Sequence, residues 1–228
     1  MVLLGTILNT ISVAVGSSLG LFSGKLISSK AQTNIITIFG LFTLAISIDM
    51  MGHMNEPINV FLALVIGALI GGSLKLHERF TAFVSRFDNG NSLATGFIKA
   101  SMLFCVGGMT IIGCMNEGIG GDYNLIMIKS CMDLISSFFL AAALGRGVLL
   151  SAVGVFIIQG SLTLGFHCIG QFLLFDLSGL ISDLTATGGI LLLALGLDLV
   201  GIKKFQMLDL IPALALLPII HYLHLLIV

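Results

Sequence analysis

The sequence predicts an all-α, polytopic membrane protein with about eight transmembrane helices, and three observations support this fold class. First, 57 % of the 228 residues are hydrophobic and only 9 % are charged, with a mean hydropathy of +1.14, whereas about a quarter of the residues of a soluble domain are charged. Second, apolar runs of membrane-spanning length recur along the chain. Third, the basic residues between these runs fall on alternate connections, as the positive-inside rule requires.

Eight apolar segments can be delimited, and we interpret each as one transmembrane helix of a single integral membrane domain over residues 1–228. They cover approximately residues 2–24, 35–51, 58–74, 97–116, 124–144, 148–174, 184–202 and 208–228. The first segment begins at Val2, with no basic region before it and no Ala-x-Ala cleavage site. We therefore interpret it as a retained span rather than a signal peptide.

The basic residues predict the orientation of these helices. Nine of the ten Lys and Arg residues fall in, or at the edge of, connections that follow an odd-numbered segment, so these connections are predicted to be cytoplasmic, with both termini outside. The even-to-odd connections contain no Lys or Arg. The longest connection, residues 77–96, is expected to lie at the cytoplasmic interface, because residues 77–87 have the aromatic and basic spacing of a short interfacial helix.

An internal repeat is predicted from two segments that align without gaps. Residues 38–52 and 187–201 are identical at five of fifteen positions, including Asp49 with Asp198 and Gly52 with Gly201. They lie in the second and seventh segments, which run in opposite directions under the predicted topology. We therefore expect an inverted-topology repeat of residues 1–76 and 146–228, with an inserted helix pair at 97–145. Many secondary transporters bind substrate at such a repeat interface.

Two opposite charges mark the centre of the fifth segment. As a helix, residues 124–144 would span about 30 Å, which places Asp133 near the midplane and Lys129 one turn away on the same face. A charge at that depth costs at least about 2.5 kcal/mol, so the pair is expected to face the protein interior. Asn9, Gln159 and Ser161 fall at comparable depth. These groups would form either a structural clasp or the polar floor of a substrate site.

Glycines at four-residue spacing predict close helix packing. Gly16, Gly20 and Gly24 share one face of the first segment, and small residues at this interval let helix backbones approach in lipid. The alternative interpretation is that this stretch lines a pathway, because it also carries the Ser17 hydroxyl. The pair at 107–108 falls in the middle of the fourth segment and is a candidate break of that helix.

Three further acidic residues, Asp49, Asp198 and Glu117, are secondary candidates for ion or substrate binding. No metal site or other cofactor is expected, since His221 and His224 lack a neighbouring Cys or carboxylate. The four cysteines show no CxxC spacing and fall inside or at the ends of apolar runs, which is typical of packing residues. Because the chain has no basic patch, nucleic acid is not an expected partner.

Several local patterns together resemble one protein family over essentially the whole chain. They are the stretches 4–9 (LGTILN), 100–109 (ASMLFCVGGM), 129–133 (KSCMD), 158–161 (IQGS) and 196–204 (GLDLVGIKK). The joint pattern resembles the YqgA/YdfK-like family of bacterial inner-membrane proteins (DUF554), a family of unknown function. The resemblance implies a multi-pass protein of the bacterial cytoplasmic membrane with an expected role in transport. This chain departs from the family pattern at Asp198, where the family is expected to carry Asn.

These features favour a secondary transporter or facilitator for a small polar or anionic solute. Lys129 would neutralise an anionic group, or Asp133 would take up a coupling proton, while Asn9, Gln159 and Ser161 would supply neutral hydrogen bonds. Coupling to Na⁺ or H⁺ is left open, as are the channel, scaffold and sensory-subunit alternatives. An enzyme is not expected, because no span carries His and Glu at metal-ligand spacing and no nucleophile elbow occurs. The glycine-lined grooves favour a homo-oligomer, most simply a dimer.

Overall fold

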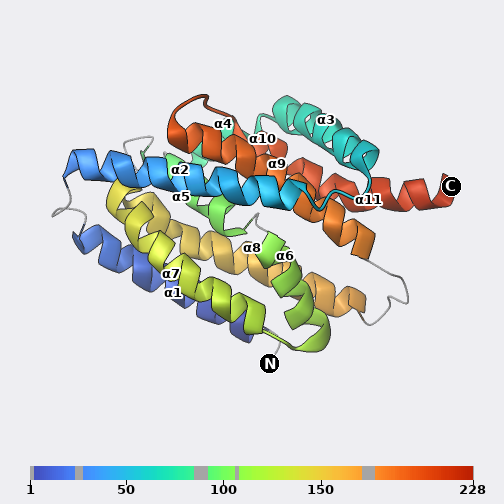
Figure 1. The fold of residues 1–228 in the computed structure, drawn as a ribbon, viewed down its shortest axis with the longest axis horizontal. Helices are drawn as coiled ribbons and strands as arrows, with labels where there is room; N and C mark the ends of the chain where they lie inside the picture. Colours follow the sequence, from blue (N-terminus) through green and yellow to red (C-terminus); the bar gives the residue numbers. More distant parts are fainter. Residues whose placement is uncertain (1–2, 24–27, 85–91, 106–107, 171–177, 228) are drawn as a thin grey trace.

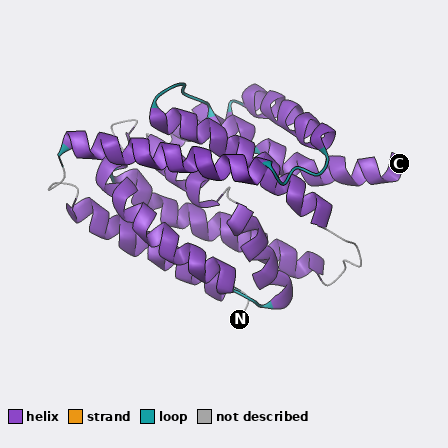
Figure 2. Cartoon of the chain, in the orientation of Figure 1, coloured by secondary structure: helices purple, strands orange, loops and turns teal. Residues whose placement is uncertain are grey.

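The structure, a computed structural model, describes residues 3–23, 28–84, 92–105, 108–170 and 178–227. Within these ranges the chain forms helices and no strand (Figure 1; Figure 2). Seven of these helices are long and apolar enough to cross a membrane, and a bent pair of shorter helices adds an eighth crossing if the pair forms one span. The prediction of an all-α membrane protein with about eight spans is therefore confirmed.

The helices follow the apolar segments of the sequence closely. In chain order the elements are α1 (Leu4–Ser23), α2 (Ser29–Met51), α3 (Pro57–Leu74), α4 (Leu76–Val84), α5 (Ser92–Cys105), α6 (Gly108–Met115), the π-helical turn η2 (Asn116–Gly120), α7 (Asn124–Leu144), α8 (Arg146–Gly170), α9 (Ser178–Val200), α10 (Met207–Leu210) and α11 (Pro212–Ile227). Pro57 occupies the first turn of α3, where a missing N–H group costs nothing. Gly145 separates α7 from α8 with a φ of 79°, which favours glycine.

The fourth span is broken at the predicted glycine pair. Helix α5 ends at Cys105, α6 begins at Gly108, and the span bends by 58°. Residues 106–107 lie outside the described residues. The Thr110 hydroxyl donates to the Phe104 carbonyl oxygen at 2.9 Å, which satisfies a group that the break leaves without a helical partner.

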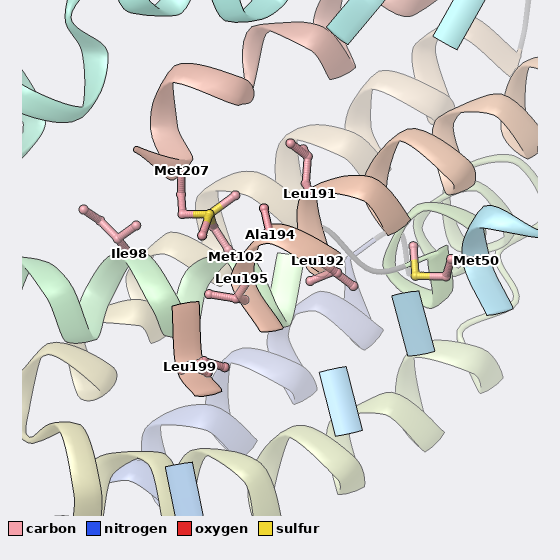
Figure 3. Close-up of a cluster of buried hydrophobic side chains, with 9 residues drawn as sticks. All are labelled: Met50, Ile98, Met102, Leu191, Leu192, Ala194, Leu195, Leu199 and Met207. Carbon is pink, nitrogen blue, oxygen red and sulfur yellow. The ribbon is translucent and has the colours of Figure 1, made fainter. Parts of the chain in front are cut away.

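The helices form two packed groups (Figure 1). Helix α1 runs along α7 and also contacts α8, which packs on α5, while in the other group α2 runs along α9 and α3 along α11. Buried apolar side chains of α2, α5, α9 and α10, among them Met50, Met102, Leu195 and Met207, join the groups in the core (Figure 3). Large apolar side chains such as Phe22 face outward, as expected of a surface in contact with lipid.

Gly16 and Gly20 bring α1 into backbone contact with α7. A Cβ atom added to Gly16 would lie 2.2 Å from the Leu134 carbonyl oxygen, and one added to Gly20 would lie 2.0 Å from that of Phe138. Any larger residue would therefore push the two helices apart. Gly24, the third glycine of the predicted groove, lies outside the described residues.

The two segments that align in the sequence pack against each other as α2 and α9. The Cβ position of Gly40 lies 2.9 Å from the Val200 backbone nitrogen, and that of Gly189 lies 3.1 Å from the Met51 backbone nitrogen. The alignment pairs Gly40 with Gly189 and Met51 with Val200, so each contact maps onto the other. Such local symmetry is expected at a repeat interface. The inverted repeat of residues 1–76 and 146–228 and the orientation of the termini stay predictions.

Buried carboxylates hold the N-termini of distant helices. Asp183 Oδ1 accepts hydrogen bonds of 2.8 Å from the backbone N–H groups of Asn55 and Glu56 at the start of α3. Asp209 Oδ1 accepts one of 2.8 Å from the backbone N–H group of His77 in α4. These N–H groups have no intrahelical partner, and the helix dipole favours a negative charge beside them.

The predicted start of the seventh segment is wrong because one of these carboxylates, Asp183, is buried inside a helix. The seventh segment is predicted to begin at residue 184, but α9 begins at Ser178, and Asp183 lies fully buried within it. A hydropathy pattern places an acidic residue outside a span, whereas the two N–H donors at the start of α3 compensate the charge and allow its burial.

We expect Gly20→Ala to reduce the free energy of unfolding by about 1–3 kcal/mol, because the new methyl group overlaps the Phe138 carbonyl oxygen. Gly165→Ala in α8 is the matched control, since nothing lies within 4 Å of its Cβ position and it reports the gain in helix propensity alone. Thermal unfolding of the purified protein in detergent measures both. Equal melting temperatures for the two variants would contradict the contact between α1 and α7.

Candidate functional site

Four polar side chains from three helices meet inside the bundle, and we call them the polar cluster: Asn9 of α1, Lys129 and Asp133 of α7, and Gln159 of α8. Lys129 Nζ forms a direct ion pair with Asp133 Oδ2, and the two residues are only 5 % and 6 % exposed. The predicted pair therefore forms and faces the protein interior. The Lys129 ammonium group also lies 5.9 Å from the centroid of the Phe104 ring, within cation–π distance.

The charge of Asp133 fixes the direction of the hydrogen bonds in the polar cluster. A carboxylate only accepts, so Asn9 presents Nδ2, which donates to Asp133 Oδ2 at 3.0 Å and to Gln159 Oε1 at 2.8 Å. Reversing either amide would bring two donors or two acceptors together. This order leaves Asn9 Oδ1 and Gln159 Nε2, both in fully buried residues, without a partner among the described residues. Neither Asn9 nor Gln159 is among the residues that line the cavity described next.

A cavity of about 500 Å³ lies between α2, α5, α6, α7 and α9, and the ion pair forms part of its wall. Most of the wall is apolar and includes the rings of Phe39 and Phe104 and the side chains of Ile46 and Ile112. The broken span borders the cavity on both sides of its break, through Phe104 of α5 and Ile112 of α6. The volume lies within the range of small-molecule sites.

Several polar groups line the cavity. Lys129 and Asp133 lie in its wall together with Thr185, whose Oγ1 atom is buried and has no hydrogen-bond partner in the described part of the chain. Asp49 and His53, both exposed, line the cavity where α2 ends. The cavity therefore connects the molecular surface at that end of the bundle with the buried ion pair.

Asp198, the repeat counterpart of Asp49, is not among the residues that line the cavity. Its Oδ1 atom forms an ion pair with Lys99 Nζ at 3.0 Å, which ties the C-terminal end of α9 to α5. Because α2 and α9 pack antiparallel and each acid lies near the C-terminal end of its helix, the two acids lie at opposite ends of the bundle.

Two predicted site residues lie apart from the polar cluster. The Ser161 side chain is exposed and donates to the Ile157 carbonyl oxygen of its own helix. It does not join Gln159, because positions two apart on a helix point about 200° away from each other. Ser17 is fully buried in α1, does not line the cavity, and its Oγ atom has no hydrogen-bond partner within the described ranges.

Glu117, a secondary candidate from the sequence, forms a separate buried site, which we call the Glu117 site, with Thr6 and Thr163. Its Oε1 atom accepts a hydrogen bond of 2.6 Å from the backbone N–H group of Gly5 at the start of α1. Its Oε2 atom lies 3.3 Å from Thr6 Oγ1 and 3.4 Å from Thr163 Oγ1. The Glu117 side chain is 0 % exposed, although its sequence position predicts a connection between spans.

The sequence pattern does not single out Thr6, Thr163 or Thr185. A threonine in a membrane helix usually bonds to its own backbone, so a threonine alone does not indicate a site. For two of them the spacing does carry a signal. Thr6 lies three residues before Asn9, and Thr163 lies four residues after Gln159, so each shares the helix face of a polar-cluster residue. Thr185 carries no comparable signal.

The sequence matches one protein family over nearly its whole length, described as "Protein of unknown function (DUF554)", with the match covering residues 4–222. One similar protein is "Uncharacterized membrane protein YdfK" of Bacillus subtilis (strain 168), 34 % identical over 222 residues, or 96 % of this chain and 95 % of the relative. Another is "Uncharacterized protein YqgA" of Escherichia coli (strain K12), 30 % identical over 223 residues, or 93 % of this chain and 94 % of the relative. No solved structure matches.

We expect Lys129→Met and Asp133→Asn, made singly, each to reduce the free energy of unfolding by about 3–5 kcal/mol, because each leaves a buried charge without its partner. The double variant removes both charges and is expected to recover at least half of the summed loss. Thermal unfolding of the four proteins in detergent completes the double-mutant cycle. Additive losses would contradict a direct ion pair.

Proposed function

The chain belongs to the DUF554 family, and we propose that it is a secondary transporter or facilitator that moves a small solute with an anionic group across the bacterial cytoplasmic membrane. The observation that carries this proposal is the cavity of about 500 Å³ that leads from the molecular surface to a buried ion pair. A pair that served only as a structural clasp would be stabilised by close packing on every side. Here one side of the pair is open to a space of small-molecule size.

The cavity wall favours a solute with an apolar body and one anionic end. Apolar side chains, among them Phe39 and Ile46, form most of the wall and can contact the apolar body. Lys129 carries three N–H donors and can contact a carboxylate or a similar group. The Thr185 hydroxyl, which has no partner in the described fold, can donate a further hydrogen bond.

Binding would exchange one partner of Lys129 for another. A solute carboxylate that contacts the ammonium group displaces Asp133, which keeps the hydrogen bond from Asn9 Nδ2. A proton taken up by Asp133 would remove the negative charge that then lacks a cation. This exchange would couple solute binding to proton uptake, as in a proton-linked symporter.

The opposite end of the bundle supports access from one side at a time. Lys99 and Asp198 form their ion pair of 3.0 Å between α5 and α9 at that end, and Ile98, Leu195 and Leu199 belong to the buried apolar cluster of the same two helices. Alternating access would require this ion pair to open while the cavity closes. The broken α5–α6 span borders the cavity and is well placed to move, as discontinuous helices are in secondary transporters.

The test begins with a thermal-shift screen of amino acids and short organic acids, followed by counterflow uptake of the stabilising compounds into proteoliposomes. We expect Thr185→Val to reduce uptake about fivefold with little change in melting temperature, because one hydrogen bond to the solute is lost and none within the fold. Thr187→Val is the matched control on the same helix, since its hydroxyl bonds to the Asp183 carbonyl oxygen and lies outside the cavity.

A charge-reversed variant separates transport from stability. Lys129→Asp combined with Asp133→Lys keeps an ion pair at the same spacing, so we expect most of the melting temperature to be retained. Counterflow should be lost, because the cation moves one turn along α7 and Asn9 then faces a group that cannot accept a hydrogen bond. Counterflow at the wild-type rate in this variant would contradict the proposal and favour the structural clasp.

A further inference from the structure

Glu117 holds a buried carboxylate for which the described residues provide no cationic partner. None of the ion pairs within the described ranges includes this residue. An isolated carboxylate in a water-free interior is costly. The N–H group of Gly5 offsets part of this cost at Oε1. The Oε2 atom, in contrast, faces the neutral hydroxyls of Thr6 and Thr163.

The spacing of the oxygen atoms at Oε2 suits a bound cation better than hydrogen bonds. Glu117 Oε2, Thr6 Oγ1 and Thr163 Oγ1 form a nearly equilateral triangle with sides of 3.3, 3.4 and 3.4 Å. Hydrogen bonds between hydroxyl and carboxylate oxygens are usually about 2.7–2.8 Å long. An octahedral ion whose ligands lie about 3.4 Å apart along each edge is about 2.4 Å from each ligand, within the range of a large hard cation bound by oxygen.

We propose that the Glu117 site binds a sodium ion through these three oxygen atoms. Magnesium needs distances of about 2.0–2.1 Å, which would draw the ligands to edges of about 2.9 Å. Calcium shares the longer distance but takes about six to eight oxygen ligands, usually with several carboxylates, whereas this triangle holds one. Potassium forms longer bonds to oxygen and requires a wider triangle. One positive charge neutralises the carboxylate, and two hydroxyls add neutral ligands.

Two local features support a ligand at this place. Glu117 lies in the π-helical turn η2, a rare conformation that is frequent at functional sites. Gly118 allows this turn to approach α8, because a Cβ atom there would lie 2.5 Å from the Thr163 carbonyl oxygen. Asp183, which holds the start of α3 in a similar way, differs from Glu117 because a histidine ring lies beside its second oxygen, with His221 Nδ1 3.8 Å from Oδ2.

The Glu117 site lies one helical turn from the polar cluster on two helices. Thr6 and Asn9 are one turn apart on α1, and Gln159 and Thr163 are one turn apart on α8. An ion that fixes both threonines also restrains Asn9, which donates to Asp133, and Gln159, which accepts a hydrogen bond from Asn9. As a binding site, the Glu117 site does not depend on the proposed transport function.

The test is the melting temperature of the full-length protein in detergent, titrated with NaCl at constant ionic strength and compared with KCl and choline chloride. We expect NaCl to raise the melting temperature by about 3–6 °C once sodium exceeds its Kd tenfold. Thr163→Val is expected to lose this rise, and Thr163→Ser, which restores the hydroxyl, to retain it. Glu117→Gln keeps an oxygen for the Gly5 N–H group but should also lose the rise. Thr10→Val is the control, since its hydroxyl bonds to the Thr6 carbonyl oxygen.

The proposal is overturned if the three salts act alike on the wild-type protein, or if Thr163→Val keeps the full sodium response. Counterflow uptake without any sodium response would overturn the sodium site and leave the transport proposal intact. A selective sodium response that Thr163→Val abolishes supports the site, even if no transported compound is found.

Discussion

The buried ion pair between Lys129 and Asp133 is the interaction on which the arrangement of the surrounding helices depends. Neither charge can face lipid at low cost, so α7 must turn this side toward other protein. Asn9 from α1 and Gln159 from α8 then extend the hydrogen bonds of the pair across three helices. The glycines of α1 allow this convergence, because they bring the α1 backbone onto that of α7.

The cost of an unpaired polar group in the membrane interior also governs the ends of the helices. Backbone N–H groups at a helix start need acceptors wherever water is scarce. In this chain buried acids from distant positions supply them, Glu117 for α1, Asp183 for α3 and Asp209 for α4. These carboxylates therefore join distant helices, and the Glu117 site differs from the other two because two hydroxyls lie beside its second oxygen.

Local features of the fold could be predicted from the sequence because short-range spacing encodes them. The limits of α7, the pairing of Lys129 with Asp133 and the break in the fourth span all follow from residues within a few positions of one another. The cavity could not be predicted, since its wall combines side chains from five helices whose mutual placement no periodicity encodes. The burial of Glu117 and Asp183 could not be predicted either. A hydropathy pattern places the end of a span at a charged residue, even when a distant helix compensates that charge.

The most direct measurement of the central claim is the reactivity of a cysteine placed in the wall of the cavity that leads to the ion pair. Thr185→Cys, in a protein whose exposed Cys131 and Cys168 are replaced by Ser, is treated with a membrane-impermeant thiol reagent in right-side-out and inside-out vesicles. The cavity predicts modification from the side on which Asp49 and His53 lie, which is the outer side under the predicted topology, and protection from the other side. Absence of modification from both sides, or equal modification from both, would contradict a one-sided cavity that leads to the buried pair.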